Sequence, residues 1–273
     1  MTAGEAWTRE ILRELRADSY RPAAWLRFLA RSFERARVTR IERRREHRQA
    51  VLVGAAGLAA WTAVVAVRPW LALAGALSWL LVVAMLDWHL GMLEDDRGRS
   101  LRRLGLPNQL SLARGAVVPA LVVGSPALLT AILIPAGLTD AIDGPLARRR
   151  REETRLGRWL DGTVDTLVLS ATAVGAARHG LLPWWAAALV LSRYLLQVLA
   201  VALGYFVSAR SPWHAASVSA RVPGLVLFAG LVLATLQFPP AGLLVSLGAL
   251  GGIAALALTV VRICRVEVLV RVQ

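Results

Sequence analysis

Four aspartates lie close together in the middle of this 273-residue chain. Asp140 and Asp143 are three residues apart and Asp161 and Asp165 are four apart, so each pair would project from one face of a helix. The segment between the pairs is short and arginine-rich, which makes the two helices antiparallel neighbours and brings the four carboxylates together. Like charges at close range disfavour each other's ionised form, so the cluster needs cations. Hard divalent ions with oxygen ligands, Mg²⁺ or Mn²⁺, meet this need where the substrate is a phosphate.

Small residues and an arginine accompany these acids. Gly144, Ala147 and, at the start of the next helix, Gly157 leave room for a ligand to approach the backbone closely. Arg148 lies about one turn beyond Asp143, where its guanidinium group could bind a diphosphate through two parallel hydrogen bonds. The three arginines that follow Arg148 are interpreted as positive charge that anchors a cytoplasmic loop.

The composition favours a membrane protein. The chain is 56% hydrophobic, with a mean hydropathy of +0.54, and carries a formal charge of +14. This combination argues against a soluble basic domain, so nucleic acid is not the expected partner. One cysteine and four scattered histidines exclude a disulfide framework and a cysteine- or histidine-rich metal site.

Apolar runs of roughly membrane-spanning length predict eight helices across the bilayer. They cover residues 51–67, 69–91, 108–124, 126–144, 160–178, 182–207, 220–238 and 241–263. With a cytoplasmic N-terminus, the arginine-rich connections all fall inside, as the positive-inside rule requires. The chain is therefore expected to be an all-α, multi-pass protein of a bacterial plasma membrane whose aspartates face the cytoplasm.

The chain is divided into four parts. Residues 1–50 form a basic cytoplasmic or interfacial segment, 51–105 an accessory transmembrane hairpin with a charged linker, 106–263 a six-helix catalytic core, and 264–273 a cytoplasmic tail. The first hundred residues contain none of the acids and are expected to be dispensable for chemistry.

The basic segment contains an amphipathic helix with two interpretations. Trp25, Phe28, Leu29 and Phe33 lie on one helical face, and arginines surround the rest. The helix either packs on its own protein or lies on a surface of anionic lipid.

The spacing of the acids and small residues also resembles a known signature. The pattern Asp140-x2-Asp143-Gly144-x2-Ala147-Arg148-x8-Gly157-x3-Asp161-x3-Asp165 is similar to that of the CDP-alcohol phosphotransferases, the CDP-alcohol phosphatidyltransferase family, with every fixed position filled. The resemblance covers residues 106–263 and not the first hundred.

A second stretch resembles the segment that opens the first core helix of that family. Residues Pro107, Asn108, Ser111 and Arg114 follow the family's Pro-Asn-x-x-Thr-x-x-Arg pattern, in which Ser111 keeps the hydroxyl group. In the family this segment helps to bind the cytidine nucleotide. Taken alone, the stretch would be a helix start with Asn108 as its cap.

The resemblance implies a reaction in which a CDP-alcohol, CDP-diacylglycerol above all, passes its phospho-alcohol to an acceptor hydroxyl and releases CMP. It implies a two-metal site in which Asp140 and Asp161 contact both ions, Asp143 one and Asp165 the other. Asp165 would also be the general base. A homodimer is a further implication.

The nucleotide would be held by residues from both stretches. The resemblance assigns this role to Asn108, Ser111, Gly144, Ala147, Arg148 and Gly157, with Thr154 as a weaker candidate.

The acceptor alcohol is not specified by the resemblance. Several branches of the family carry Pro after the third aspartate and a basic residue after the fourth, whereas this chain has Gly162 and Thr166. Arg193, deep in a predicted span, and Arg221, at a helix start, could each bind a phosphate on the acceptor. An interhelical ion pair for Arg193 and an interface anchor for Arg221 are the alternatives.

Two other classes of function remain open. Intramembrane acids also mark the ion pathways of transporters, although such sites usually lie at the bilayer midplane rather than beside a cytoplasmic loop. A non-catalytic membrane scaffold is the other alternative, which the complete set of acids disfavours.

Overall fold

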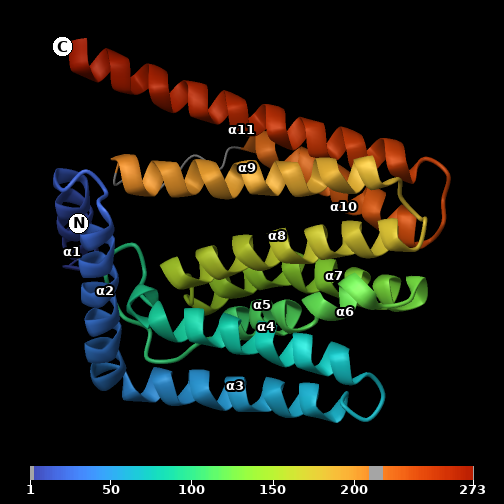
Figure 1. The fold of residues 1–273 in the computed structure, drawn as a ribbon, viewed down its shortest axis with the longest axis horizontal. Coiled ribbons are helices and arrows are strands. Elements are labelled where there is room, and N and C mark those ends of the chain that lie inside the picture. The colour runs from blue at the N-terminus through green and yellow to red at the C-terminus, as the bar shows by residue number, and fades with distance from the viewer. Residues whose placement is uncertain (1–2, 209–217, 273) are drawn as a thin grey trace. The chain divides into compact units, whose positions relative to one another are not determined.

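A computed structural model describes residues 3–208 and 218–272, and in these ranges every regular element is helical apart from one β-bridge between Glu94 and Ser100 (Figure 1). The centre of the predicted loop around residues 207–221 lies outside the described residues. The helices are α1 (Ala3–Ala17), α2 (Pro22–Glu42), α3 (Arg44–Ala63), α4 (Pro69–Trp88), η1 (Leu90–Met92), α5 (Leu106–Ala116), α6 (Val118–Val123), α7 (Pro126–Arg150), α8 (Arg155–Arg178), α9 (Trp184–Ser208), α10 (Val218–Thr235) and α11 (Ala241–Val272).

Four of the described helices are long and apolar enough to cross a membrane. These candidate spans are Pro69–Trp88, Pro126–Arg150, Trp184–Val207 and Ala241–Arg262, and a shorter apolar helix covers Arg221–Thr235. The predicted all-α, multi-pass class is therefore confirmed. The finer division into a six-helix core and an accessory hairpin stays a prediction, as do the domain boundaries.

The chain forms two compact units. The first contains the described residues up to Val123 together with Ile134–Val168, and the second contains Gly124–Leu133 and the described residues from Leu169 onward. The boundary within α7 falls next to Pro135, which lacks the N–H group that a helix interior needs. All four aspartates of the predicted site lie in the first unit.

The hairpin of α3 and α4 is built on two reciprocal contacts between glycine and tryptophan. A Cβ atom on Gly57 would lie 2.3 Å from the ring of Trp79, and one on Gly75 would lie 2.2 Å from the ring of Trp61. Trp79 also donates its indole N–H to the carbonyl oxygen of Gly54 at 2.8 Å. Such small residues allow two apolar helices to approach closely within a membrane.

The core of the first unit joins this hairpin to the helices of the predicted site. Its buried cluster consists of Ala50, Trp61, Trp79, Leu86, Leu90, Leu93, Leu104, Leu112 and Leu156. Leu112 belongs to α5 and Leu156 to α8, so both helices share apolar packing with the N-terminal hairpin.

The predicted single helix over residues 108–124 is wrong. The chain forms α5, which ends at Ala116, and then the short helix α6, which begins at Val118. Pro119 is the second residue of α6, where its missing N–H group cannot continue the hydrogen bonds of α5.

The start of α5 also differs from the Asn-cap alternative. The N-cap is Gly105, whose φ of 75° lies in the left-handed region that glycine adopts without strain. Glu152, from the α7–α8 connection, accepts the N–H of Leu106 at 3.3 Å and pairs with Arg103 at 2.7 Å. A carboxylate from the connection thereby satisfies a free donor of the first helical turn.

The start of α8 is tied to elements far away in the sequence. Arg155 pairs with Glu5 of α1 at 2.7 Å and with Glu94 at 3.4 Å, and Arg158 pairs with Asp96. These contacts fix the N-terminal end of the helix that carries Asp161 and Asp165.

The loop that supplies Glu94 and Asp96 is organised by Asp95. Its carboxylate accepts the backbone N–H groups of Arg97 and Arg99, each at 2.9 Å, and the guanidinium of Arg99 at 2.6 Å. The hydrogen bonds from Arg99 above all lower the pKa of Asp95. The loop therefore keeps this organisation throughout the neutral range.

The second unit packs α10 against α11 through glycines. A Cβ atom on Gly248 of α11 would lie 2.5 Å from the backbone nitrogen of Leu227, and one on Gly230 of α10 would lie 2.7 Å from that of Val245. Residues with side chains would force these backbones apart.

Candidate active site

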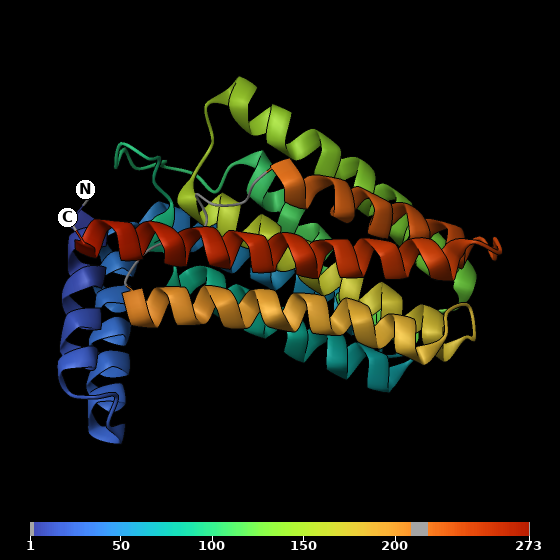
Figure 2. The same ribbon diagram turned by 90° about the horizontal axis from the view of Figure 1, so that it is seen from above.

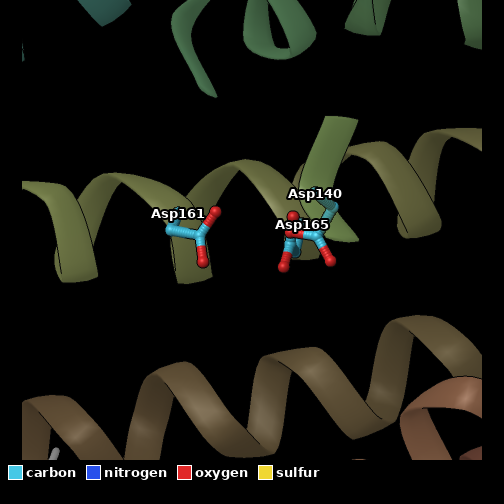
Figure 3. A group of neighbouring side chains, drawn as sticks. All are labelled: Asp140, Asp161 and Asp165. Atoms are coloured by element: carbon cyan, nitrogen blue, oxygen red, sulfur yellow. The ribbon is translucent and has the colours of Figure 1, made fainter. Parts of the chain in front are cut away.

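Helices α7 and α8 bring the predicted acids together. α7 carries Asp140 and Asp143, α8 carries Asp161 and Asp165, and a short connection over residues 151–154 joins the two helices. Figure 3 shows the carboxylates of Asp161 and Asp165 on the same side of α8, with Asp140 of α7 beside Asp165. Carboxylate oxygens of these three residues lie within 4.8 Å of one another. The predicted convergence is thus observed for three of the four acids directly.

The fourth acid joins the cluster through Arg114 of α5. This guanidinium group lies 2.6 Å from Asp143, 2.6 Å from Asp161, 3.3 Å from Asp140 and 3.6 Å from Asp165. Its side chain is only 4% exposed, and its Nε atom has no hydrogen-bond partner in the described structure. Arg114 is therefore the internal counterion of the cluster.

The four acids differ in their access to a ligand. The side chain of Asp143 is 7% exposed, whereas those of Asp140, Asp161 and Asp165 are 44%, 40% and 39% exposed. Asp143 therefore forms the closed back of the site, and the other three carboxylates form its open front.

The residues present fit a divalent cation. Carboxylate oxygens are the hard donors that Mg²⁺ and Mn²⁺ prefer. One guanidinium group cannot balance four ionised carboxylates, so the cluster retains a negative charge that a divalent ion would neutralise. The grouped carboxylate oxygens of Asp140, Asp161 and Asp165 would be the ligands of such an ion.

The two nucleotide-binding candidates on α5 lie behind the acids. Asn108 is 2% exposed and donates its amide N–H to the carbonyl oxygen of Leu104 at 2.6 Å. Ser111 is 3% exposed, and its hydroxyl oxygen lies 3.4 Å from the Arg114 guanidinium as a hydrogen-bond acceptor. Ser111 is thus connected to the carboxylates through Arg114.

The candidates Thr154 and Gly157 form the start of α8. Thr154 is buried, and its hydroxyl oxygen accepts the N–H of Gly157 at 3.0 Å, which is the hydrogen bond of a helix N-cap. A Cβ atom on Gly157 would lie 2.7 Å from the side-chain oxygen of Asn108. The missing side chain of Gly157 therefore lets the starts of α5 and α8 meet, a packing role that the spacing alone did not reveal.

The remaining candidates of the signature lie at the end of α7. Arg148 is exposed and has no ion pair recorded in the described part of the chain. Its guanidinium lies 3.6 Å from where a Cβ atom on Gly144 would be, so it extends over that glycine. The carbonyl oxygen of Ala147 accepts the N–H of Glu152 at 2.9 Å and so helps to end the helix.

Arg193 and Arg221 belong to the second unit. Arg193 is 8% exposed and donates a hydrogen bond to the carbonyl oxygen of Gly248 at 3.1 Å. The interhelical ion pair considered for Arg193 would instead require a carboxylate as its partner. A Cβ atom on Gly252 would lie 2.3 Å from its Nε atom, which shows how closely α11 covers it. Arg221 is exposed on α10.

Two features of the site were not foreseen. The sequence placed Arg114 in a nucleotide-binding segment, whereas the structure places its guanidinium among the acids. Glu152 lies beside Glu153 in an arginine-rich stretch, and nothing in the local sequence distinguishes it as the residue that binds the start of α5.

Comparison with known proteins assigns the family. Residues 104–261, more than half of the chain, match the model of the CDP-alcohol phosphatidyltransferase family. The chain belongs to this family, and the resemblance drawn from the aspartate signature is confirmed.

Several relatives are similar to part of the chain. A cardiolipin synthase (CMP-forming) of Streptomyces coelicolor is 34% identical over 123 residues, which are 41% of this chain and 56% of that protein. A putative cardiolipin synthase of Mycobacterium tuberculosis is 35% identical over 97 residues, or 34% of this chain and 46% of that protein. A probable phosphatidylglycerophosphate synthase of the same species is 31% identical over 104 residues, or 34% of this chain and 50% of that protein. The chain thus spans about half the length of these relatives, and no solved structure matches it.

Proposed function

We propose that the protein transfers a phosphatidyl group from CDP-diacylglycerol to an acceptor hydroxyl and releases CMP. The observation that carries this proposal is the cluster of four aspartates around Arg114, within the part of the chain that matches the family. The acceptor oxygen forms a bond to the phosphorus that bears diacylglycerol, and the bond between that phosphorus and CMP breaks. The hydroxyl proton passes to a carboxylate of the site.

Asp165 is the base in this proposal. Its side chain is partly exposed and lies 3.6 Å from Arg114, so an oxygen is left to meet an incoming hydroxyl group. Asp143 is unsuited to this role because it is buried and bound to Arg114 at 2.6 Å. A positioned general base contributes roughly 10² to 10⁴ in rate.

Asp140, Asp161 and Asp165 would hold divalent cations, Mg²⁺ or Mn²⁺, with Asp143 as a further ligand. When bound, such ions neutralise the diphosphate and stabilise the departing CMP. Arg114 holds Asp143 and Asp161 in place by hydrogen bonds of 2.6 Å.

Arg148 is the nucleotide-binding residue that the geometry supports best. It is exposed, extends over Gly144 and has no recorded carboxylate partner, so its guanidinium is available to a diphosphate. Asn108 and Ser111 would support the nucleotide site from behind, and Thr154 and Gly157 by fixing the start of α8.

The acceptor is proposed to carry a phosphate group. The names of the relatives, cardiolipin synthase and phosphatidylglycerophosphate synthase, favour glycerol-based acceptors of this kind. Arg193 and Arg221 are the candidate partners of that phosphate. The hydroxyl group of Thr166 donates a hydrogen bond to the carbonyl oxygen of Gly162 at 2.8 Å, so the hydroxyl group has a hydrogen-bond acceptor within α8 itself.

The setting of the reaction is proposed from the charge pattern and the family. The arginine-rich connections support a site at the cytoplasmic face of a bacterial plasma membrane, and the resemblance to the family supports a homodimer.

The test is CMP release by the purified full chain in detergent. CDP-diacylglycerol would be supplied with glycerol 3-phosphate, phosphatidylglycerol or an uncharged diol, in Mg²⁺, Mn²⁺ or a chelator. Metal-dependent CMP release with a phosphate-bearing acceptor is expected, and Asp161→Asn should abolish it. Cation flux into vesicles, without release of CMP from CDP-diacylglycerol in the presence of any of the acceptors, would instead support the transporter alternative.

A further inference from the structure

Helix α2 crosses the end of the α3–α4 hairpin rather than running alongside it (Figures 1 and 2). Arg40 pairs with Asp87, near the end of α4, at 2.5 Å, and the ring of Phe33 meets that of Trp88 edge to face at 5.6 Å. Trp88 also donates its indole N–H to Ser32 at 3.0 Å. Since α4 is a candidate membrane span, a helix attached across its end would lie at the level of the lipid headgroups.

One face of α2 carries an exposed apolar strip. Its residues are Leu26, Leu29, Phe33 and Ile41, which are 69%, 49%, 49% and 58% exposed. Their spacing places them along one side of the helix. Phe33 belongs both to this strip and to the contact with Trp88, so the strip lies on the side of α2 that adjoins the spanning helix.

The opposite face of α2 is covered by α1. Arg31 pairs with Glu10 and Glu14, and Arg27 pairs with Asp18. The charges of these two arginines are therefore already balanced within the protein, on the side away from the strip.

A second group of arginines lies where α2 meets α3. They are exposed, and no carboxylate partner is recorded for them in the described part of the chain. The group consists of Arg44, Arg45 and Arg48. Arg44 and Arg48 are four residues apart and so share a face of α3.

We propose that α2 lies in the headgroup layer with the Leu26, Leu29, Phe33 and Ile41 strip in the acyl chains, and that the unpaired arginines bind phosphates of anionic phospholipids. The apolar strip beside a spanning helix fixes the depth, and the arginines at the same level supply the preference for negative lipids. This surface is separate from the aspartate cluster and does not depend on the proposed reaction.

The depth of α2 can be measured with nitroxide labels. In a full-length Cys264→Ser background, single cysteines would replace Leu26 or Leu29 in the strip, and Glu42, exposed on another side of α2, as the matched control. In nanodiscs that contain phosphatidylglycerol, labels at 26 and 29 should be relaxed mainly by oxygen, and a label at 42 by a water-soluble nickel chelate. Equal access of the chelate to all three positions would overturn the proposal. Spin–spin broadening at 26 and 29 would also overturn it, since a second copy of the chain would then cover the strip.

The lipid preference can be measured separately with spin-labelled lipids. Arg44→Gln/Arg48→Gln should lower the preference for phosphatidylglycerol over phosphatidylcholine by roughly fivefold for each arginine removed, because one arginine near the surface contributes about 1 kcal/mol. The control Arg9→Gln/Arg13→Gln removes the same charge from α1 and should leave the preference unchanged. An equal loss in both variants would show a general charge effect and overturn the assignment to the unpaired arginines.

Discussion

Asp165 and its neighbour Asp143 have opposite environments, although both belong to the same signature. Asp143 is buried against Arg114, whereas Asp165 is partly exposed at the front of the site. In the proposed reaction this difference suits the two carboxylates to different tasks, since Asp143 would hold the site together and Asp165 would meet the substrate.

Asp165→Asn is expected to lower CMP release by roughly 10² to 10⁴, because the amide can still offer an oxygen ligand but cannot accept the proton. Binding of CDP-diacylglycerol should be largely retained, since the other three carboxylates remain. Turnover and equilibrium binding of a labelled CDP-alcohol would be measured side by side, with Glu34→Gln, an exposed position on α2, as the control for loss of one charge. Near-normal turnover at saturating metal would remove Asp165 from the role of base.

Arg114→Gln is expected to destabilise the metal-free protein, because the carboxylates lose their recorded internal counterion. Added Mg²⁺ should recover much of the lost stability by taking over the charge balance. Thermal unfolding of both proteins with Mg²⁺ and with chelator checks this. If metal raises the melting temperature of Arg114→Gln no more than that of the unchanged protein, the counterion role is wrong.

The α3–α4 hairpin shows how a membrane element is specified by very small residues. The rings of Trp61 and Trp79 fill the spaces left by Gly75 and Gly57, so neither helix can shift without opening a gap or causing a clash.

Gly75→Ala is expected to destabilise the protein by about 1–3 kcal/mol, because the added methyl group overlaps the ring of Trp61. Gly242→Ala is the matched control, since its nearest neighbour would lie at an ordinary contact distance of 3.8 Å. Thermal unfolding in one detergent compares the two. A compensating Trp61→Leu in the Gly75→Ala background should recover part of the loss, and no recovery would place the cause elsewhere.

Local sequence patterns predicted some of the helices and part of the site, but they could not predict features that depend on packing between elements. Hydropathy and the 3- and 4-residue spacings of the aspartates were sufficient to predict α7, α8 and the convergence of the acids. They could not predict the break at Pro119, because proline near a helix end is compatible with either one helix or two. The positions of Arg114 and Glu152 depend on contacts between segments far apart in the chain, which no local pattern records.

A chain that starts at Arg99 is expected to be less stable than the full protein and to release CMP more slowly, although it keeps the whole signature. It would lack Glu94 and Asp96, which fix the start of α8, and the residues of α3 and α4 in the buried core. The sequence alone had predicted that this region is dispensable for chemistry. Melting temperature and CMP release would be measured for the shortened chain, for the full chain and for the full-length variant Glu94→Gln/Asp96→Asn. The values of this variant are expected to lie between those of the other two proteins. Equal values for all three proteins would restore the accessory interpretation.

The ion pair between Glu5 and Arg155 joins residues that are 150 positions apart, and this separation sets an order of events during synthesis. At about 5–20 residues per second, the ribosome needs roughly 8 to 30 s to produce Arg155 after Glu5. During that interval, before Arg155 has been made, α1 and α2 can pair and the hairpin can enter the bilayer. The helix that bears Asp161 and Asp165 is synthesised after the N-terminal segments that its first residues contact, so the acidic cluster can be completed only after those segments have been made.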